Sequence, residues 1–527
     1  MTTPLLDSAS EEAQPNAAPL VTLTRVLVVV ILVVGVVGRF VTRSDLWLDE
    51  ALSVNIAKLP LGDITGWLRH DGAPPLYYWM LHAWMSAFGD SDFAVRSLSG
   101  VVGLGAFPLA WACGRRVAGE NTAWITVVVL ALNPFAIRFA TETRMYGLEI
   151  TLVFGAILAV RRAFERPSIA RLAVVAAITS ALLYTHYWCL SFVAAGVCVV
   201  GLIWLRTSGA SRNSAARILG AMIVGGFTLV AWLPALAYQR VHTGTPWAVR
   251  QFPTIPMGRS ILEFAGCDHA EGWAIVYACV AVLIIGVFGH ATRHGTIEFD
   301  LRNHSTVAPE AMLGVLALGF GAGLAYVSNS GFQARYSAIV LPCFVVVLAR
   351  GIAVFASHRV RFAVVSAIVV VGVGGLIRNV TENRTQMGDI ASSIAGRARS
   401  NDVVIYCPDQ LGPATHRVLR RTPQGRSLRE YVYPVRKNPL SSVALVDWVD
   451  YTKRLGEISP IEAATRTLKL AGPHSIFVVS SAGYITHDAL CPSFVTALAT
   501  LSGRDPRYVI ASNPEIFEHG GYYEFPR

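Results

Sequence analysis

The stretch 44–96 begins SDLWLDEA (44–51) and continues through HDGAPPLYYWMLHAW (70–84), directly after an apolar run long enough to cross a membrane. Adjacent carboxylates, Asp49 and Glu50, open it, and His70 and Asp71 follow. Ionisable groups at a membrane boundary are costly to keep there, so they suggest a functional site rather than an ordinary solvated loop. Together with the neighbouring aromatic residues, these side chains favour a pocket that binds sugar.

The composition of the whole chain is that of a membrane protein. Of 527 residues, 53% are hydrophobic and only 15% are charged, and the mean hydropathy is +0.49. A soluble domain carries about a quarter charged residues. The formal net charge of +10 comes from arginines scattered through short loops between apolar runs, which matches the positive-inside rule and excludes nucleic-acid binding.

The apolar runs predict a polytopic α-helical membrane protein with about 11 transmembrane helices. Residues 1–20 are polar and predict a disordered cytoplasmic tail, and 21–378 predict the membrane domain, with a large outer loop at 42–96. The run from 170 to 205 is so continuous that we place its division near His186. The predicted spans are 21–41, 97–114, 122–139, 146–163, 170–187, 188–205, 217–237, 273–290, 310–328, 336–356 and 361–377.

Arginines predict the orientation. Most lie in alternate short loops, which we assign to the cytoplasm together with the N-terminus. The short outer loops hold little besides Arg138, Arg144 and Arg335, and charges on the disfavoured side suggest anion binding. Within the large outer loop, short helices are predicted at Asp49–Leu59 and from Pro74 to about Phe88, the second with aromatic residues that anchor it in the membrane interface.

Residues 379–527 have a mixed composition and predict an extracytoplasmic α/β domain. Strands are expected at 402–406, 474–481 and 507–512, and helices near 409–421, 441–456, 459–471 and 487–502. Cys407 and Cys491 fall in this domain and could pair if it lies outside the cell, although sequence alone does not give their separation. No catalytic motif is apparent in the domain.

Several motifs occur in the order typical of one superfamily. They are WLDEA (47–51), APPLYYWMLHAW (73–84), DSDFAVRSLSG (90–100), ETRMYGLE (142–149), YTHYW (184–188) and QARYSAIVLP (333–342). In order and membrane placement, the chain resembles the GT-C integral membrane glycosyltransferases over residues 20–350. The branch it resembles contains protein O-mannosyltransferase-like and aminoarabinose-transferase-like enzymes.

The resemblance implies transfer of a sugar from a polyprenyl-phosphate donor at the outer face of the membrane. It places the catalytic base at Asp49, with Glu50 as its neighbour. A carboxylate suits the removal of a proton from an attacking hydroxyl, and a single displacement implies inversion at the anomeric carbon. The alternative for this pair is a helix N-terminal charge that favours the macrodipole.

A lipid-phosphate leaving group needs cations near the membrane surface. We expect Arg144 and Arg335 to bind it, with Tyr146 and Tyr336 as hydrogen-bond donors, because the guanidinium fork matches phosphate. Snorkelling from the end of a span is the alternative for both arginines.

Glu142, His70, Asp71 and His186 are the expected substrate-binding residues. Glu142 would orient Arg144, bind the acceptor or help to hold a divalent metal ion, since metal use varies across this superfamily. Glu142 and His70 are the candidate ligands, although no metal-binding spacing is present, and a lone histidine is usually structural.

The expected function is therefore inverting transfer of a hexosyl or pentosyl group to a glycan, glycolipid or protein acceptor of the cell envelope, in a bacterial plasma membrane. A lipid-linked sugar transporter or flippase is one alternative, but it would favour charges at mid-membrane and broken spans. A membrane scaffold organised around the C-terminal domain is another. It leaves the outer-face residues unexplained.

Overall fold

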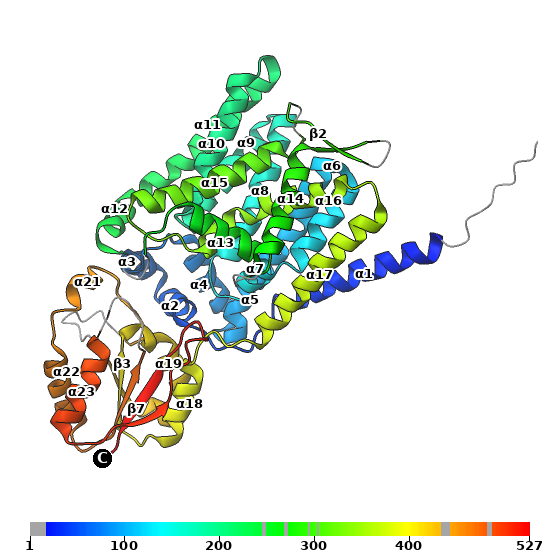
Figure 1. Cartoon of the computed structure of the whole chain (residues 1–527). Coiled ribbons are helices and arrows are strands. Elements are labelled where there is room, and N and C mark those ends of the chain that lie inside the picture. Colours follow the sequence, from blue (N-terminus) through cyan, green and yellow to red (C-terminus); the bar gives the residue numbers. More distant parts are fainter. Residues whose placement is uncertain are drawn as a thin grey trace, which may run out of the picture.

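The computed structural model describes residues 17–244, 249–267, 272–292, 296–302, 305–433, 443–481, 487 and 489–527, and the side chains from Arg25 onward. A helical bundle forms one part of the molecule and a small α/β domain forms the other (Figure 1). The predicted tail at 1–20 lies largely outside the described residues, and the first helix begins at Ala17.

Helices occupy each of the predicted apolar runs. They are α1 (Ala17–Gly38), α5 (Asp92–Leu104), α6 (Ala106–Ala131), α7 (Pro134–Ala140), α8 (Tyr146–Glu165), α9 (Ile169–Thr185), α10 (Cys189–Arg206), α11 (Gly209–Phe227), η1 (Thr228–Trp232), α12 (Leu233–His242), α13 (Thr254–Phe264), α14 (Trp273–Phe288), α15 (Ala308–Val327), η3 (Ala334–Ile339), α16 (Leu341–Val354) and α17 (His358–Thr381). A two-stranded hairpin, β1 (Gly289–Ala291) with β2 (Ile297–Phe299), follows α14. The long 170–205 run divides between α9 and α10, at His186, as predicted.

Within the described residues, five helical stretches are long and apolar enough to cross a membrane by length and composition. Shorter apolar helices such as α9, α14 and α16 occupy other predicted spans, so the number of crossings stays a prediction. α6 contains the predicted turn between two spans as a sharp kink at Ala118 and Gly119. Gly119 has φ of 81°, a conformation that glycine adopts without a steric cost.

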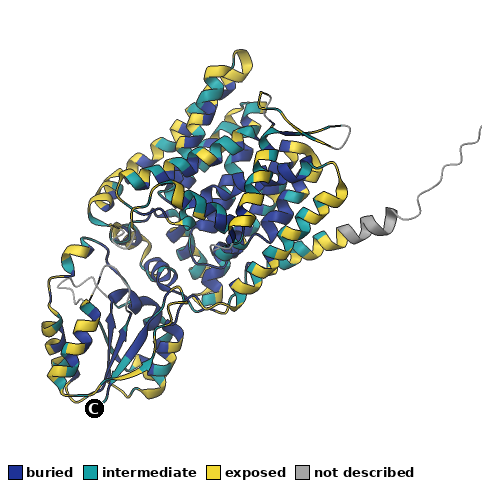
Figure 2. Ribbon diagram, viewed as in Figure 1, coloured by how far each residue is buried: buried dark blue, intermediate teal, exposed yellow. Residues whose placement is uncertain are grey.

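The outer surface of the bundle is apolar. α17 is largely exposed along its length, and so is the described part of α1 (Figure 2). In water this surface would be unfavourable, whereas lipid chains can cover it. The fold is therefore that of a polytopic membrane protein.

The 42–96 loop folds into three helices, α2 (Leu48–Ala57), α3 (Leu61–Asp71) and α4 (Leu76–Phe88). α2 and α4 correspond to the two predicted helices, and α3 is additional, starting directly after Pro60. The interpretation of the aromatic residues as membrane anchors is wrong for Tyr77 and Tyr78. Both are buried, with hydroxyls bonded to Ser99 and Asp71.

The C-terminal domain contains a five-stranded sheet in the order β4-β3-β5-β7-β6. β3 (Val403–Cys407) pairs in parallel with β4 (Arg429–Val432) and β5 (Ile476–Ser480), and β7 (Gly521–Phe525) lies antiparallel between β5 and β6 (Arg507–Ile510). Its helical elements are α18 (Met387–Arg397), η4 (Asp409–Leu411), α19 (Gly412–Leu419), α20 (Pro423–Arg426), α21 (Tyr451–Arg454), α22 (Pro460–Ala471) and α23 (Leu490–Ser502).

The three predicted strands are confirmed, but the predicted helix at 441–456 is wrong for most of its length. Within the described residues of that stretch, only α21 is an α-helix. The preceding segment is extended instead, because it pairs with the membrane domain. The Trp448 N–H donates to the His70 carbonyl over 2.9 Å, and Thr243 forms a β-bridge with Val449.

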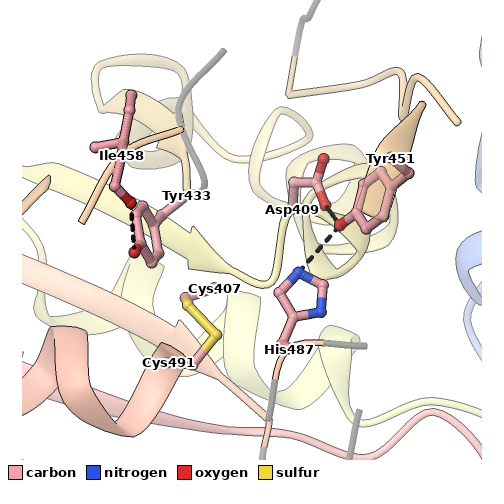
Figure 3. Close-up of a disulfide and its surroundings, with 7 residues drawn as sticks. All are labelled: Cys407, Asp409, Tyr433, Tyr451, Ile458, His487 and Cys491. Carbon is pink, nitrogen blue, oxygen red and sulfur yellow. Dashed lines mark hydrogen bonds between the residues drawn. A yellow bond between two sulfur atoms is a disulfide. The ribbon is translucent and has the colours of Figure 1, made fainter. Parts of the chain in front are cut away.

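Cys407 and Cys491 form a disulfide that joins the end of β3 to α23 (Figure 3). Beside it the Tyr451 hydroxyl donates to Asp409 and lies 3.1 Å from His487 Nε2. The disulfide holds α23 against the sheet, and the polar network joins η4, α21 and His487.

The C-terminal domain docks on the 42–96 loop. α19 packs on α2, and Arg417 and Arg421 both donate to the Asp92 carboxylate at the start of α5. The two parts therefore share one interface, and the candidate site lies along it.

Candidate active site between the bundle and the C-terminal domain

A cavity of about 680 Å³ lies where the helical bundle meets the C-terminal domain. Its walls come from the loop before α2, from α7, η3 and α17, and from the C-terminal domain. The lining residues are Trp47, Leu48, Asp49, Pro134, Phe135, Arg138, Phe139, Glu142, Glu263, Gly266, Cys267, Gln333, Ala334, Arg335, Gly375, Arg378, Asn379, Glu382, Gln410, Trp448, Phe517, Glu518 and His519.

Asp49 points into this cavity from the first turn of α2. Its side chain is 22% exposed, and its Oδ2 lies 3.6 Å from Arg335 Nη1 and 3.9 Å from Arg144 Nη2. Arg144 Nη1 also donates to Ser53 Oγ over 3.0 Å, and the Ser53 hydroxyl donates to the Asp49 carbonyl. Residues far apart in the sequence therefore form one charged cluster, with the carboxylate facing two guanidinium groups.

Glu50, the neighbour of Asp49, faces away from the cavity. Its buried carboxylate accepts two hydrogen bonds from Arg96, of 2.7 and 2.6 Å, and a third of 2.9 Å from the Thr143 N–H. Arg96 in turn donates to the carbonyls of Ser44 and Asp45, which precede α2. Burial raises the pKa of Glu50, but the Arg96 guanidinium outweighs burial and holds the pKa below its ordinary value. The structure therefore does not bring Glu50 to the reacting groups, but uses it to position the start of α2.

The expected phosphate-binding residues lie together. The Arg335 guanidinium lies 5.6 Å from the centre of the Tyr336 ring and 5.7 Å from that of Trp47. Tyr146 starts α8, and within the described residues its buried hydroxyl has no hydrogen-bond partner. Of these residues only Arg335 lines the cavity, and Arg144 and the two tyrosines lie beside it, so this end of the site is cationic.

Glu142 also lines the cavity, but it does not orient Arg144. Its carboxylate accepts from Trp47 Nε1 over 3.1 Å and pairs with Arg138 Nε at 3.2 Å. Arg138, the third arginine of the predicted short outer loops, is thus part of the same wall.

Asp71 lies near the charged cluster, whereas His70 does not join it. Asp71 accepts from the Tyr78 hydroxyl over 2.7 Å. Burial raises its pKa, Arg144 acts in the opposite direction, and the Asp49 charge adds to the increase. His70 Nδ1 instead lies 2.9 Å from Asp447 Oδ1 of the C-terminal domain, so it belongs to the domain interface.

His186 pairs with Glu149 of α8 at 2.9 Å and packs against the rings of Tyr146 and Tyr336. It therefore supports the tyrosines. The candidate metal ligands do not meet, because Glu142 is held by Trp47 and Arg138 while His70 is held by Asp447. Among the described residues, no group of three or more His, Cys, Asp or Glu side chains could hold a metal ion.

The C-terminal domain contributes residues that sequence reasoning missed. Phe517, Glu518 and His519 line the cavity together with Gln410 and Trp448. Phe517 packs edge-on against Trp47, with ring centres 5.0 Å apart. These residues lie in segments without a recognisable motif, and only the docking of the domain reveals them.

Comparisons with known proteins agree with this architecture. The family model described as "Dolichyl-phosphate-mannose-protein mannosyltransferase" matches residues 72–238, about a third of the chain. The crystal structure of ArnT from Cupriavidus metallidurans bound to undecaprenyl phosphate superposes with a TM-score of 0.54 at 11% identity, covering 96% of this chain and 98% of that one. The apo structure of the same protein gives 0.57 at 12% identity with the same coverage. None of the curated protein sequences compared with the chain is a significant match.

The match to ArnT extends over the bundle and the C-terminal domain, because almost all of both chains is covered. The fold is that of the GT-C glycosyltransferases. The resemblance to the branch with mannosyltransferase-like and aminoarabinose-transferase-like enzymes is confirmed.

Proposed function

We propose that this chain with the GT-C fold is an inverting glycosyltransferase. It takes a hexosyl or pentosyl group from a polyprenyl-phosphate donor and transfers it to a hydroxyl of a cell-envelope glycan or glycolipid at the outer face of the membrane. The observation that carries the proposal is the position of Asp49, a partly exposed carboxylate that faces Arg335 and Arg144 in the cavity between the two domains.

Asp49 is the general base. The acceptor hydroxyl gives its proton to the Asp49 carboxylate as its oxygen attacks the anomeric carbon, and the bond from that carbon to the phosphate oxygen breaks. The electron pair of that bond leaves with the lipid phosphate. One displacement with one base inverts the anomeric configuration.

Arg335 and Arg144 stabilise the leaving phosphate. Both guanidinium groups are directed toward the Asp49 carboxylate, so negative charge that develops beside Asp49 meets two cations. The Tyr146 hydroxyl is a further donor at this end of the site. Glu50 and Arg96 act at a distance, by fixing the backbone from which Asp49 projects.

Two observations support an outer-face, lipid-linked reaction. The Cys407–Cys491 disulfide belongs to the domain that closes the cavity, and disulfides persist in oxidising compartments. ArnT, which has the same fold, has been crystallised with undecaprenyl phosphate. A protein acceptor is the second candidate, because the family model that matches 72–238 is named for protein mannosyltransferases.

The test uses the purified full-length protein in lipid nanodiscs with a panel of radiolabelled polyprenyl-phosphate sugars. Each donor is offered an envelope-glycolipid fraction or an unfolded serine- and threonine-rich peptide. Transfer to glycolipid with an inverted linkage supports the proposal, transfer to peptide alone selects the second candidate, and no transfer from any donor contradicts both.

Arg335→Ala tests the assignment of the phosphate site. We expect a KM for the donor raised roughly tenfold or more and a KM for the acceptor that stays close to that of wild type. An unchanged donor KM would remove Arg335 from the site. Arg302→Ala is the control for loss of a positive charge, because Arg302 does not line the cavity.

A further inference from the structure

The segment 517–519 of the C-terminal domain is hydrogen-bonded to the start of α2. The Leu48 N–H, one of the unpaired donors of the first turn, donates to Glu518 Oε1 over 3.1 Å. Trp47, the N-cap residue, makes no side-chain capping bond of its own. Glu518 therefore caps from another domain the helix that carries Asp49.

The backbone of Glu518 is held as firmly as its side chain. Its carbonyl accepts from the Gln386 N–H over 3.0 Å, and its N–H donates to the Arg384 carbonyl over 2.9 Å. The residue is 4% exposed and lines the cavity. The side chain is thus placed by contacts on both sides of the domain interface.

One oxygen of the Glu518 carboxyl group makes no hydrogen bond within the described residues. Within the described part of the chain, the buried Oε2 atom of Glu518 has no hydrogen-bond partner. A buried polar atom without a partner is unfavourable, and Glu518 lines the cavity, so a ligand is a fitting partner for its carboxyl group. Burial raises the pKa of Glu518 to about 8, against the Thr385 side chain and the Leu48 N–H, which lower it, and the nearby charges of Asp49 and Glu50 add to the increase. At neutral pH the group is therefore mainly a carboxylic acid that can donate as well as accept.

The two walls of the cavity differ in chemistry. The arginines are on the membrane-domain wall, at Arg138, Arg335 and Arg378. That wall also carries the aromatic rings of Trp47, Phe135 and Phe139. Among the described lining residues, the wall from the C-terminal domain has no arginine and presents aromatic rings and hydrogen-bonding groups. Those residues are Gln410, Trp448, Phe517, Glu518 and His519. Aromatic faces with a few polar groups suit a saccharide, whereas a phosphate needs cations, and the lining arginines lie on the other wall.

We propose that the C-terminal domain forms the acceptor subsite and that Glu518 binds a hydroxyl group of the acceptor saccharide through its carboxyl group, holding it toward Asp49. This proposal rests on the proposed function, of which it specifies the acceptor side. Glu518 is then a specificity residue supplied by the domain that carries no catalytic motif.

Kinetics with the donor and acceptor pair that gives turnover test the role of Glu518. Glu518→Ala is expected to raise the KM for the acceptor roughly tenfold, because one hydrogen bond in a buried site is lost, with the KM for the donor unchanged. Glu518→Gln retains an oxygen for the Leu48 N–H and an N–H₂ donor, so it should restore acceptor binding. Glu515→Ala, an exposed carboxylate in the same loop, is the matched control.

Equal changes in both KM values, or a glutamine variant as defective as the alanine variant, would overturn the acceptor role and leave Glu518 only a helix cap. The thermal unfolding midpoint of each variant separates a folding defect from a binding defect.

A second measurement needs no turnover. Dicyclohexylcarbodiimide modifies protonated carboxyl groups in apolar surroundings, and we expect it to label Glu518 at pH 7 and to leave Glu515 unmodified, as read by peptide mass spectrometry. Octyl β-glucoside below its micellar concentration, as a probe with sugar hydroxyls, should slow the labelling. Absence of the adduct, or a rate that ignores the glucoside, would contradict the subsite. If no donor on the panel supports transfer, the proposed function fails. The carbodiimide labelling still tests the saccharide site in that case.

Discussion

Replacing Asp49 by asparagine should have opposite effects on chemistry and on donor binding. The carboxylate is the proposed base, so its loss removes the group that takes the proton of the acceptor. The same carboxylate partly neutralises Arg335 and Arg144, at 3.6 and 3.9 Å. Under the proposed function, Asp49 therefore competes with the donor phosphate for the same two cations.

The magnitudes follow from these distances. At an effective dielectric constant near 20, each ion pair amounts to about 4–5 kcal/mol of Coulomb attraction. Partial exposure and the desolvation of the incoming phosphate offset most of this energy. We expect a net gain of about 1.4 kcal/mol in phosphate binding, which is a roughly tenfold lower Kd. Loss of a general base should lower kcat by about 10²–10⁴-fold.

The assay is binding of farnesyl phosphate to the protein in nanodiscs, with farnesol as the uncharged control ligand, together with single-turnover transfer. Asp63→Asn, an exposed carboxylate of α3, should change neither quantity. Full turnover in Asp49→Asn would refute the base. Weaker binding of farnesyl phosphate would refute the competition between Asp49 and phosphate.

Three further outcomes are expected. Glu50→Gln should lower the free energy of unfolding by about 3–5 kcal/mol, because it leaves the buried Arg96 charge unpaired. A decrease of less than about 1 kcal/mol in a urea titration would contradict this prediction. Replacing Cys491 by alanine, in a chain that also carries Cys407→Ala, should destabilise the C-terminal domain by up to about 4.6 kcal/mol from loop entropy, measured by the temperature at which protease sites in that domain open. Glu518 has a folded-state pKa of about 8 and an ordinary value of 4.5, so the folded state binds its proton more tightly and stability should fall as pH rises between these values. The fall is about 1.4 kcal/mol per pH unit, or about 5 kcal/mol over the window, and it should disappear in Glu518→Gln, so equal pH slopes in the two proteins would contradict it.

The sequence predicted the charged cluster because its members share a physical signature. Asp49, Arg144 and Arg335 are ionisable residues at the ends of apolar runs on the face with few positive charges. Helical ends on one face of a bundle come close in space, so residues separated by hundreds of positions meet there. The charge distribution indicates the two arginines, and the family resemblance singles out Asp49.

The separate roles of the adjacent residues Asp49 and Glu50 are harder to predict from the sequence. Successive residues on an α-helix point about 100° apart, since one turn contains 3.6 residues. Asp49 can therefore face the cavity only if Glu50 points to a different side, and the structure places Arg96 there. Helical geometry predicts the divergence, but the partner of Glu50 depends on tertiary packing.

The contribution of the C-terminal domain could not be predicted from the sequence. His70 meets Asp447, and Leu48 meets Glu518, across a domain interface that neither segment specifies alone. The segment before α21 has a helical pattern but becomes extended because Trp448 and Val449 pair with the bundle. Contacts of this kind follow from the docking of two folded surfaces.

The origin of one cavity wall in the C-terminal domain orders the assembly of the site in time. The helices up to Thr381 are synthesised first, and Phe517, Glu518 and His519 emerge only later. At 5–20 residues per second, translation of the intervening segment takes roughly 7–27 s. Throughout that interval a newly inserted bundle already holds its arginines and Asp49, but the cavity wall formed by residues 517–519 does not yet exist. Membrane integration and completion of the cavity are therefore separate steps in the biogenesis of this protein.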